Sequence, residues 1–213
     1  NFSADGKKLL YTTWNDAKQG AIVERDLASG SERVLTTQPG FYYSPRYARD
    51  GSKIVWSKQS GSSLTGSLSS GEQGIWWMPA KGGDAKRIAR DGYEPQFSAD
   101  GERVTFLTGG GLSKKLQSVG LHGEEPRDVF TLKYTDFVSV SPDGQWVAFT
   151  ELFNAYLAPM PKTGGVIELG KDTTAIPVAK ISTDVGSYLH WANDSGAVHW
   201  MVGDQYFTRQ IKD

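Results

Sequence analysis

The side chains best suited to bind a ligand recur at two positions in four short segments. The segments cover residues 43–47, 93–97, 136–140 and 187–191, and each ends on a large apolar residue. Alternation with period two, the pattern of a half-buried strand, directs the residue before that apolar one to the opposite face. That position holds Arg46, Gln96, Ser139 and His190, and the position two residues earlier holds Ser44, Glu94, Phe137 and Tyr188. These eight residues are the candidate binding side chains.

The motifs of catalysis are missing from the sequence. The four segments supply only Glu94 and Asp136 as acids, and no G-x-S-x-G nucleophile turn occurs. Residues 109–114, Gly-Gly-Gly-Leu-Ser-Lys, match neither a P-loop nor a dinucleotide fingerprint. The histidines, His122, His190 and His199, do not have metal-ligand spacing, and there is no cysteine. We therefore predict no catalytic residue, no metal and no cofactor.

Several of these residues have a purely structural interpretation as well. The candidate polar side chains are either solvated by water or form a ligand or partner site, and the sequence leaves both open. His122 is expected in a turn and His199 in a packed strand. The pair Trp76-Trp77 fits packing between sheets better than a platform for a sugar.

A repeat organises the chain and positions these residues. Asp-Gly recurs at Asp5, Asp50, Asp100 and Asp143, with a degraded copy at Asp194, at intervals of 43 to 51 residues. An apolar residue precedes each Asp by three positions, an aliphatic one follows by four and an aromatic one by six. The aromatic residues are Tyr11, Trp56, Phe106, Phe149 and Trp200. Two alternating strands joined by a tight Asp-Gly hairpin explain this pattern.

Two more strands complete each unit in most repeats. A third strand is expected at 22–27, 75–78, 116–119, 156–157 and 206–211, and a fourth at 33–35, 87–89, 127–130 and 166–169. Four-stranded antiparallel units of 40 to 50 residues are the blades of a β-propeller. We therefore predict an all-β propeller domain over 1–213, with repeats at approximately 1–36, 37–90, 91–132, 133–182 and 183–213.

The motif resembles that of a known family. Phe2-Ser3-Ala4-Asp5-Gly6-Lys7, the segment 97–102 and Val140-Ser141-Pro142-Asp143-Gly144-Gln145 are similar to the Trp-Ser-Pro-Asp-Gly-Lys repeat of TolB-like propellers. The segments 153–156, 188–191 and 206–209 resemble the propeller that precedes the metal-dependent barrel of some bacterial amidohydrolase-related proteins. The resemblance implies a periplasmic or secreted protein, and in the second case a catalytic barrel outside this chain.

In a propeller the first strand of each blade faces the central channel, so the eight candidate residues are expected to line it. Two long connections, 58–74 and 170–186, are expected at one channel mouth, where a partner would bind. The first is rich in Ser and Gly and the second carries Ile176, Val178 and Ile181. Because the chain begins within one repeat and ends within another, we also expect further blades in a longer parent protein and self-association through open propeller ends.

Charge and composition limit the possible partners. The 23 basic and 24 acidic residues give a net charge of −1, which argues against nucleic acid as a partner, and no apolar run is long enough to span a membrane. The leading hypothesis is a non-catalytic binding or accessory domain that contacts a protein partner or its own catalytic domain. The alternative is the propeller part of a metal-dependent amidohydrolase or peptidase, where it shapes access of the substrate.

Overall fold

A computed structural model of the chain describes residues 1–59, 72–162 and 165–211. These residues form β-strands joined by turns and loops, and no helix occurs among them. No helix in this part of the chain could therefore cross a membrane. The all-β class expected from the repeat is confirmed.

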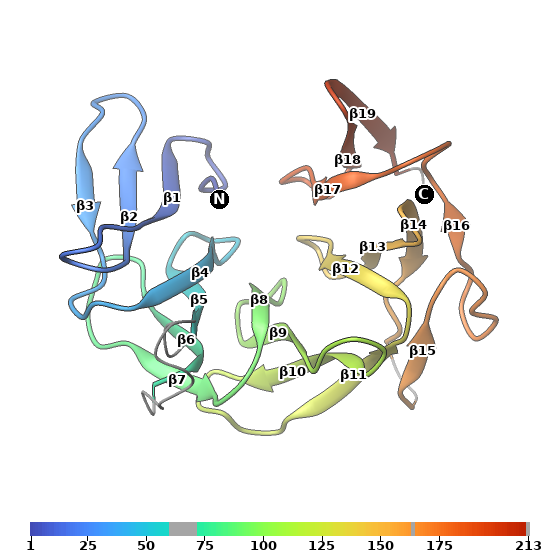
Figure 1. Cartoon of the computed structure of the whole chain (residues 1–213), viewed down its shortest axis with the longest axis horizontal. Coiled ribbons are helices and arrows are strands. Elements are labelled where there is room, and N and C mark those ends of the chain that lie inside the picture. The colour runs from blue at the N-terminus through green and yellow to red at the C-terminus, as the bar shows by residue number, and fades with distance from the viewer. Residues whose placement is uncertain (60–71, 163–164, 212–213) are drawn as a thin grey trace. The chain divides into compact units, whose positions relative to one another are not determined.

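The strands form five sheets (Figure 1), and in four of them the spatial order of the strands follows the order in the chain. The first sheet contains β1 (Lys8–Thr13), β2 (Ala21–Asp26) and β3 (Glu32–Val34). The second contains β4 (Phe41–Tyr47), β5 (Lys53–Gln59), β6 (Gly74–Pro79) and β7 (Lys86–Ala89).

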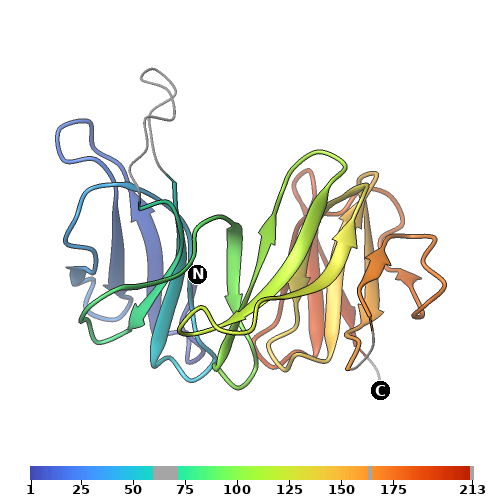
Figure 2. The ribbon, with the colours of Figure 1, turned by 90° about the horizontal axis from the view of Figure 1, so that it is seen from below.

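The third sheet has the order β15-β11-β10-β9-β8. Its strands are β8 (Tyr93–Phe97), β9 (Arg103–Thr108), β10 (Lys114–Gly120), β11 (Arg127–Leu132) and β15 (Ile167–Leu169). The fourth sheet contains β12 (Thr135–Val140), β13 (Trp146–Glu151), β14 (Asn154–Pro159) and β16 (Ala179–Lys180). The fifth contains β17 (Ser187–Trp191), β18 (Ala197–Val202) and β19 (Gln205–Gln210). Antiparallel meanders of this kind, seen on edge in Figure 2, are propeller blades, as predicted.

The Asp-Gly motif forms the hairpin between the first two strands of a blade. In three blades a serine hydroxyl donates a hydrogen bond to the carboxylate of the Asp two residues later. The same hydroxyl accepts a hydrogen bond from the backbone amide five residues later. The donations are Ser3 to Asp5 at 2.7 Å, Ser98 to Asp100 at 2.6 Å and Ser141 to Asp143 at 2.5 Å. The following glycine has φ near +70°, a conformation that other residues adopt only at a cost. The degraded copy places Ser195 there, at φ 66°.

The chain divides into two compact units. Unit 1 comprises residues 1–108 and 117–127, and unit 2 comprises residues 109–116 and 128–213. Two apolar clusters hold unit 1 together, one around Leu10, Ile54 and Trp56 and the other around Val55, Trp77 and Phe106. A third cluster in unit 2 contains Ala148, Leu189, Val198 and Trp200.

Four of the five repeated aromatic residues are buried. They are Trp56, Phe106, Phe149 and Trp200, which confirms the register of the second strand in their blades, whereas Tyr11 of the first blade is only half-buried. Trp77 packs against residues of β8 to β10 and its indole donates to Leu121 O, so packing rather than a sugar platform explains it. His122 lies in the turn after β10, as expected.

The fourth strand of the fourth repeat was predicted wrongly. Residues 166–169 were expected beside β14, but β15 pairs in parallel with β11, Phe130 opposite Ile167 and Leu132 opposite Leu169. The strand beside β14 is β16, inside the long connection 170–186. Burial of Leu169 beside the buried Phe130 and Leu132 of β11 stabilises this position.

The two long connections, 58–74 and 170–186, are described to different extents. Residues 60–71 of the first lie outside the described residues. In the second, Ile181 packs against the apolar cluster of unit 2, and Ile176 and Val178 are half-buried.

Candidate ligand-binding site

A bulge interrupts the first strand of the blades that carry the candidate residues. Pairing shifts between Tyr43 and Arg46, between Tyr93 and Gln96, and between Ser187 and His190. The residue within each shift, Ser44, Glu94 or Tyr188, has φ between 50° and 55°. Bulges re-aim side chains and concentrate near functional sites. Simple alternation therefore does not predict the directions of these side chains, and their surroundings differ between unit 1 and unit 2.

In unit 1 the four candidate residues bond to one another. The Ser44 hydroxyl donates to Glu94 Oε1 at 2.5 Å, and Arg46 Nη2 lies 2.8 Å from Glu94 Oε2. Arg46 Nη1 also donates to Gln96 Oε1 at 3.4 Å. Both oxygens of the Glu94 carboxylate are thus occupied, and the network joins β4 to β8. This arrangement suits a polar cross-link between blades better than a general base.

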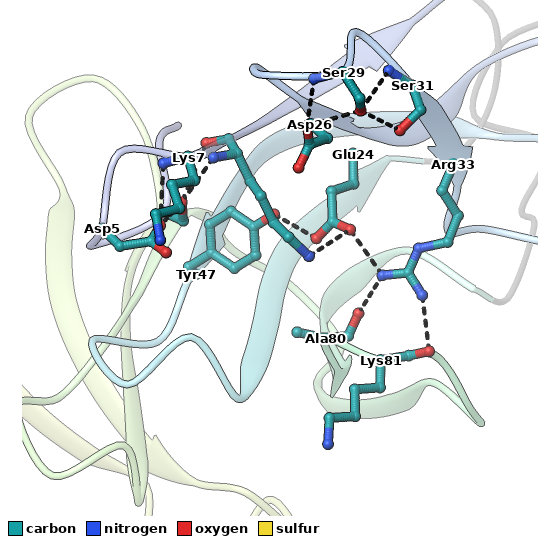
Figure 3. A network of polar contacts seen from close by, with 12 residues as sticks. Asp5, Lys7, Glu24, Asp26, Ser29, Ser31, Arg33, Tyr47, Ala80 and Lys81 are labelled. Atoms are coloured by element: carbon teal, nitrogen blue, oxygen red, sulfur yellow. Dashed lines mark hydrogen bonds and ion pairs between the residues drawn. The ribbon is translucent and has the colours of Figure 1, made fainter.

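Unit 1 holds a second polar network, around Glu24 of β2 (Figure 3). The buried Glu24 carboxylate accepts hydrogen bonds from Tyr47 at 2.7 Å, Arg33 at 2.9 Å and Lys8 at 3.1 Å. Arg33 also donates to the carbonyl oxygens of Ala80 and Lys81, so it ties the first blade to the second. Burial disfavours the carboxylate, but the bonds from Tyr47, Lys8 and Arg33 outweigh it and lower the pKa of Glu24.

In unit 2 the candidate residues have different surroundings. Ser139 is buried and therefore offers no surface to a ligand. His190 Nδ1 lies 2.7 Å from Tyr188 O, and His190 Nε2 lies 3.1 Å from the Tyr206 hydroxyl. The ring centroids of His190, His199 and Tyr206 are 5.2 to 5.8 Å apart. Burial, and then the neighbouring His190, lower the pKa of His199.

Phe137 and Tyr188 line a pocket of about 510 Å³, a volume within the range of small-ligand sites. The rest of the lining is Asp136, Thr150, Phe153, Gly186, Ser187 and Leu189. Two of these lining residues, Leu189 and Thr150, are buried and thus packed against the rest of the protein. Phe153 and Tyr188 are 74% and 80% exposed, which is unusual for rings of this size.

Phe153 reaches this pocket from a strained hairpin. Glu151 of β13 pairs with Asn154 of β14, so only Leu152 and Phe153 form the turn, with φ of 47° and 70°. Positive φ at both positions defines the type I′ turn, where Asn-Gly is strongly preferred because a bulky side chain is strained there. Leu152 is also exposed. Burial of the Leu152 and Phe153 side chains therefore contributes little that would offset the strain of this turn.

The sequence did not single out the Leu152-Phe153 turn, although a signal was present. Strand alternation through Phe149 and again through Tyr156 leaves space for only a short turn between them.

Groups of three or more His, Asp or Glu that could hold a metal ion are absent from residues 1–59, 72–162 and 165–211. Chemically, the unit 2 pocket offers aromatic faces and one carboxylate for binding.

Comparisons with known proteins support the fold. No family model matches the chain. Tricorn protease of Thermoplasma volcanium is 23% identical over 194 residues, which are 91% of this chain and 14% of that protein. The Tol-Pal system protein TolB of Rickettsia massiliae is 32% identical over 56 residues, 26% of this chain and 13% of that protein.

Among solved structures, TolB from Acinetobacter baumannii matches with a TM-score of 0.68 and 18% identity, over 97% of this chain and 49% of that one. The chain thus spans about half of that TolB structure and a much smaller part of the curated relatives. These likenesses confirm a TolB-like β-propeller fold.

Proposed function

We propose that the chain is a non-catalytic β-propeller binding domain that contacts a protein partner through the unit 2 pocket. The observation that carries the proposal is the strained and exposed pair Phe153 and Tyr188 at the pocket rim. Large side chains that are mostly in solvent, on backbone with an unfavourable φ, gain little packing from the fold itself. Exposed apolar patches of this kind are typical of interaction surfaces.

The polar groups of unit 1 favour binding over catalysis for this chain. Glu94 is bonded to Ser44 and Arg46, and Glu24 is bonded to Lys8, Arg33 and Tyr47. A general base needs an oxygen or nitrogen within reach of the proton that it removes. Carboxylates already engaged by a cation and a hydroxyl are poorly suited to that role.

A peptide library displayed on phage tests the proposal. The wild-type chain and the double variant Leu152→Asn/Phe153→Gly would be panned in parallel. We expect peptides selected by the wild type to lose binding to the double variant, because the variant removes the Phe153 ring from the pocket rim. The variant installs the preferred type I′ residues, so it should be at least as stable as the wild type, and lost binding cannot then be ascribed to unfolding.

The matched control is Leu112→Ser, which changes an exposed apolar residue of unit 2 outside the pocket. Selected peptides should bind this control as they bind the wild type. Peptides that bind the double variant as well as the wild type would refute the pocket as the contact site.

A second proposal is that the partner is a catalytic domain of the same polypeptide, an amidohydrolase or a peptidase. The observation that favours a peptidase is the likeness to tricorn protease along 91% of the chain. Sequencing the coding region on both sides of the segment tests this proposal. A metal-dependent barrel or a peptidase domain in the same reading frame would support it, and a reading frame that ends without either would refute it.

The resemblance to TolB-like propellers further leads us to propose a periplasmic or secreted location. Fractionation of the native host, with detection of the chain in the periplasmic or culture fraction, is the expected result. Recovery only with cytoplasmic markers would contradict it.

A further inference from the structure

The aromatic pocket of unit 2 combines three rings with one carboxylate. Phe137, Phe153 and Tyr188 supply the rings and Asp136 supplies the charge, whereas none of the eight lining residues is Lys, Arg or His. Ring faces carry partial negative charge and attract cations, and a carboxylate adds to that attraction. We propose that this pocket binds the cationic side chain of an arginine or lysine on the partner. The inference rests on the proposed function and specifies the chemistry of its site.

The carboxylate of Asp136 is available to a ligand. Its side chain is 70% exposed, and its nearest ion-pair partner, Lys114, lies at 3.6 Å, which is long for a hydrogen-bonded pair. Lys114 is itself mostly buried, so it approaches the carboxylate from the protein side. A ligand cation can therefore reach the exposed oxygen, in competition with Lys114 for the same charge.

The rings are arranged around that charge by three different elements. Phe137 follows Asp136 directly in β12, Phe153 lies in the turn between β13 and β14, and Tyr188 lies in β17. Phe137 packs against the apolar cluster, so its position is fixed, while Phe153 and Tyr188 extend into solvent. A cation that enters between them would bury ring surface and lose little of its own electrostatic stabilisation.

The pocket around Glu24 in unit 1 shows the opposite chemistry. Its lining includes Lys8, Arg33, Arg49 and Lys81, and Glu24 is neutralised by two of them. Asp5 and Asp50 also line that pocket, so its four cations exceed its three carboxylates by one, and the carboxylate of Glu24 is already paired when a ligand cation arrives. Charge complementarity therefore favours the unit 2 pocket for a basic side chain.

The experiment compares two small probes that differ in charge and little in shape. N-acetyl-arginine methylamide carries a guanidinium group, and the corresponding citrulline derivative carries a neutral urea. Each would be titrated into the full chain while the ring resonances of Phe153 and Tyr188 are followed by NMR. We expect the arginine probe to shift both rings and to bind about fivefold more tightly than the citrulline probe, the factor given by roughly 1 kcal/mol.

Two variants separate charge recognition from structural effects. Asp136→Asn should weaken arginine binding about fivefold and leave citrulline binding unchanged. Lys114→Gln should strengthen arginine binding, because it removes the competing cation, and damage to the fold would not produce such a gain. Tyr134→Ala is the matched control, an exposed ring of unit 2 outside the pocket that lies beside Lys133, and it should bind as the wild type does.

Equal affinity for the two probes, or an Asp136→Asn variant that binds arginine as tightly as the wild type, would overturn the proposal. Peptides from the phage selection that lack basic residues but still require Phe153 would also overturn it. That last outcome would leave the proposed binding function intact, so the two failures are distinguishable.

Discussion

A bulge in the first strand of a blade has different consequences in unit 1 and in unit 2. Glu94 in unit 1 and Tyr188 in unit 2 both lie in a bulge of the first strand of a blade, with φ of 50° and 55°. Glu94 bonds to Ser44 and Arg46 and links two strands. Tyr188 leaves its ring in solvent at the rim of a pocket.

The difference shows that backbone strain alone does not identify a binding site. In unit 1 the strain is compensated by two charge-assisted hydrogen bonds inside the chain. In unit 2 we find no comparable internal gain for the Tyr188 ring, so an external contact is the better explanation. The side chain at the bulge decides between a cross-link and an open site.

The largest effects are expected where the two units agree, in the repeated core aromatic residues. Truncation of Trp56 in unit 1 or Phe149 in unit 2 to Ala should lower the free energy of unfolding by roughly 3–5 kcal/mol, because each removes a buried aromatic side chain and leaves a cavity. Denaturant titration measures the loss, with the exposed Leu112→Ala as the control. A loss below about 1 kcal/mol in either unit would mean that its core is not organised by the repeat.

The next effect concerns unit 1 alone. Glu24→Gln should cost about 1–3 kcal/mol, because the buried acceptor of Tyr47, Lys8 and Arg33 loses its charge. Since the folded pKa of Glu24 lies below its usual value of 4.5, the ionised carboxylate stabilises the fold above that pH, and this contribution is lost as the pH falls through the folded pKa. Unfolding titrations of both proteins should therefore converge under acid conditions. A constant difference at all pH values would contradict this account.

In unit 2 we expect a substitution in the pocket to stabilise the chain. Leu152→Asn/Phe153→Gly should raise the free energy of unfolding by about 1–2 kcal/mol, since left-handed backbone is costly for Leu and Phe. Thermal or denaturant unfolding measures the gain. A destabilised variant would show that Leu152 and Phe153 stabilise the fold and would remove the contrast with unit 1.

The smallest effect is expected at His199. Its folded pKa is below the usual value of 6.5 for histidine, so the neutral form stabilises the fold above that pH and the contribution is lost as the pH falls through the folded pKa. The denaturant midpoint of the wild type should fall slightly more than that of His199→Gln between pH 7 and pH 5. The imidazole is largely solvated, so the change should be much smaller than that at Glu24. Identical midpoint shifts in the two proteins would contradict the assignment.

The sequence predicted the parts of this fold that depend on local repetition. Asp-Gly hairpins and buried aromatic residues such as Trp56 recur at fixed offsets, so each copy supports the others. The partner of β15 was predicted wrongly because a three-residue strand carries too little pattern to show which sheet it joins. Bulges were missed as well, although Pro45 and Pro95 in β4 and β8 are residues that strands tolerate mainly at edges and bulges.

The candidate site was only partly predictable for a related reason. Phe137 and Tyr188 were found by alternation, but Phe153 reaches the pocket from a neighbouring hairpin, and its role depends on a turn conformation. A single Leu-Phe dipeptide does not show that it occupies a type I′ turn. The pairing of Glu151 with Asn154, which only the structure provides, establishes it.

The most direct test of the contrast between the units applies one substitution at both bulges. Glu94→Ala and Tyr188→Ala retain the strained backbone, and both variants would be measured for stability and for binding of N-acetyl-arginine methylamide. We predict that Glu94→Ala loses about 1–3 kcal/mol of stability and keeps binding, because it leaves Ser44 and Arg46 without their acceptor. Tyr188→Ala should remain within about 0.5 kcal/mol of the wild type and lose binding. A stable Glu94→Ala variant that no longer binds, or an unstable Tyr188→Ala variant that still does, would contradict the account.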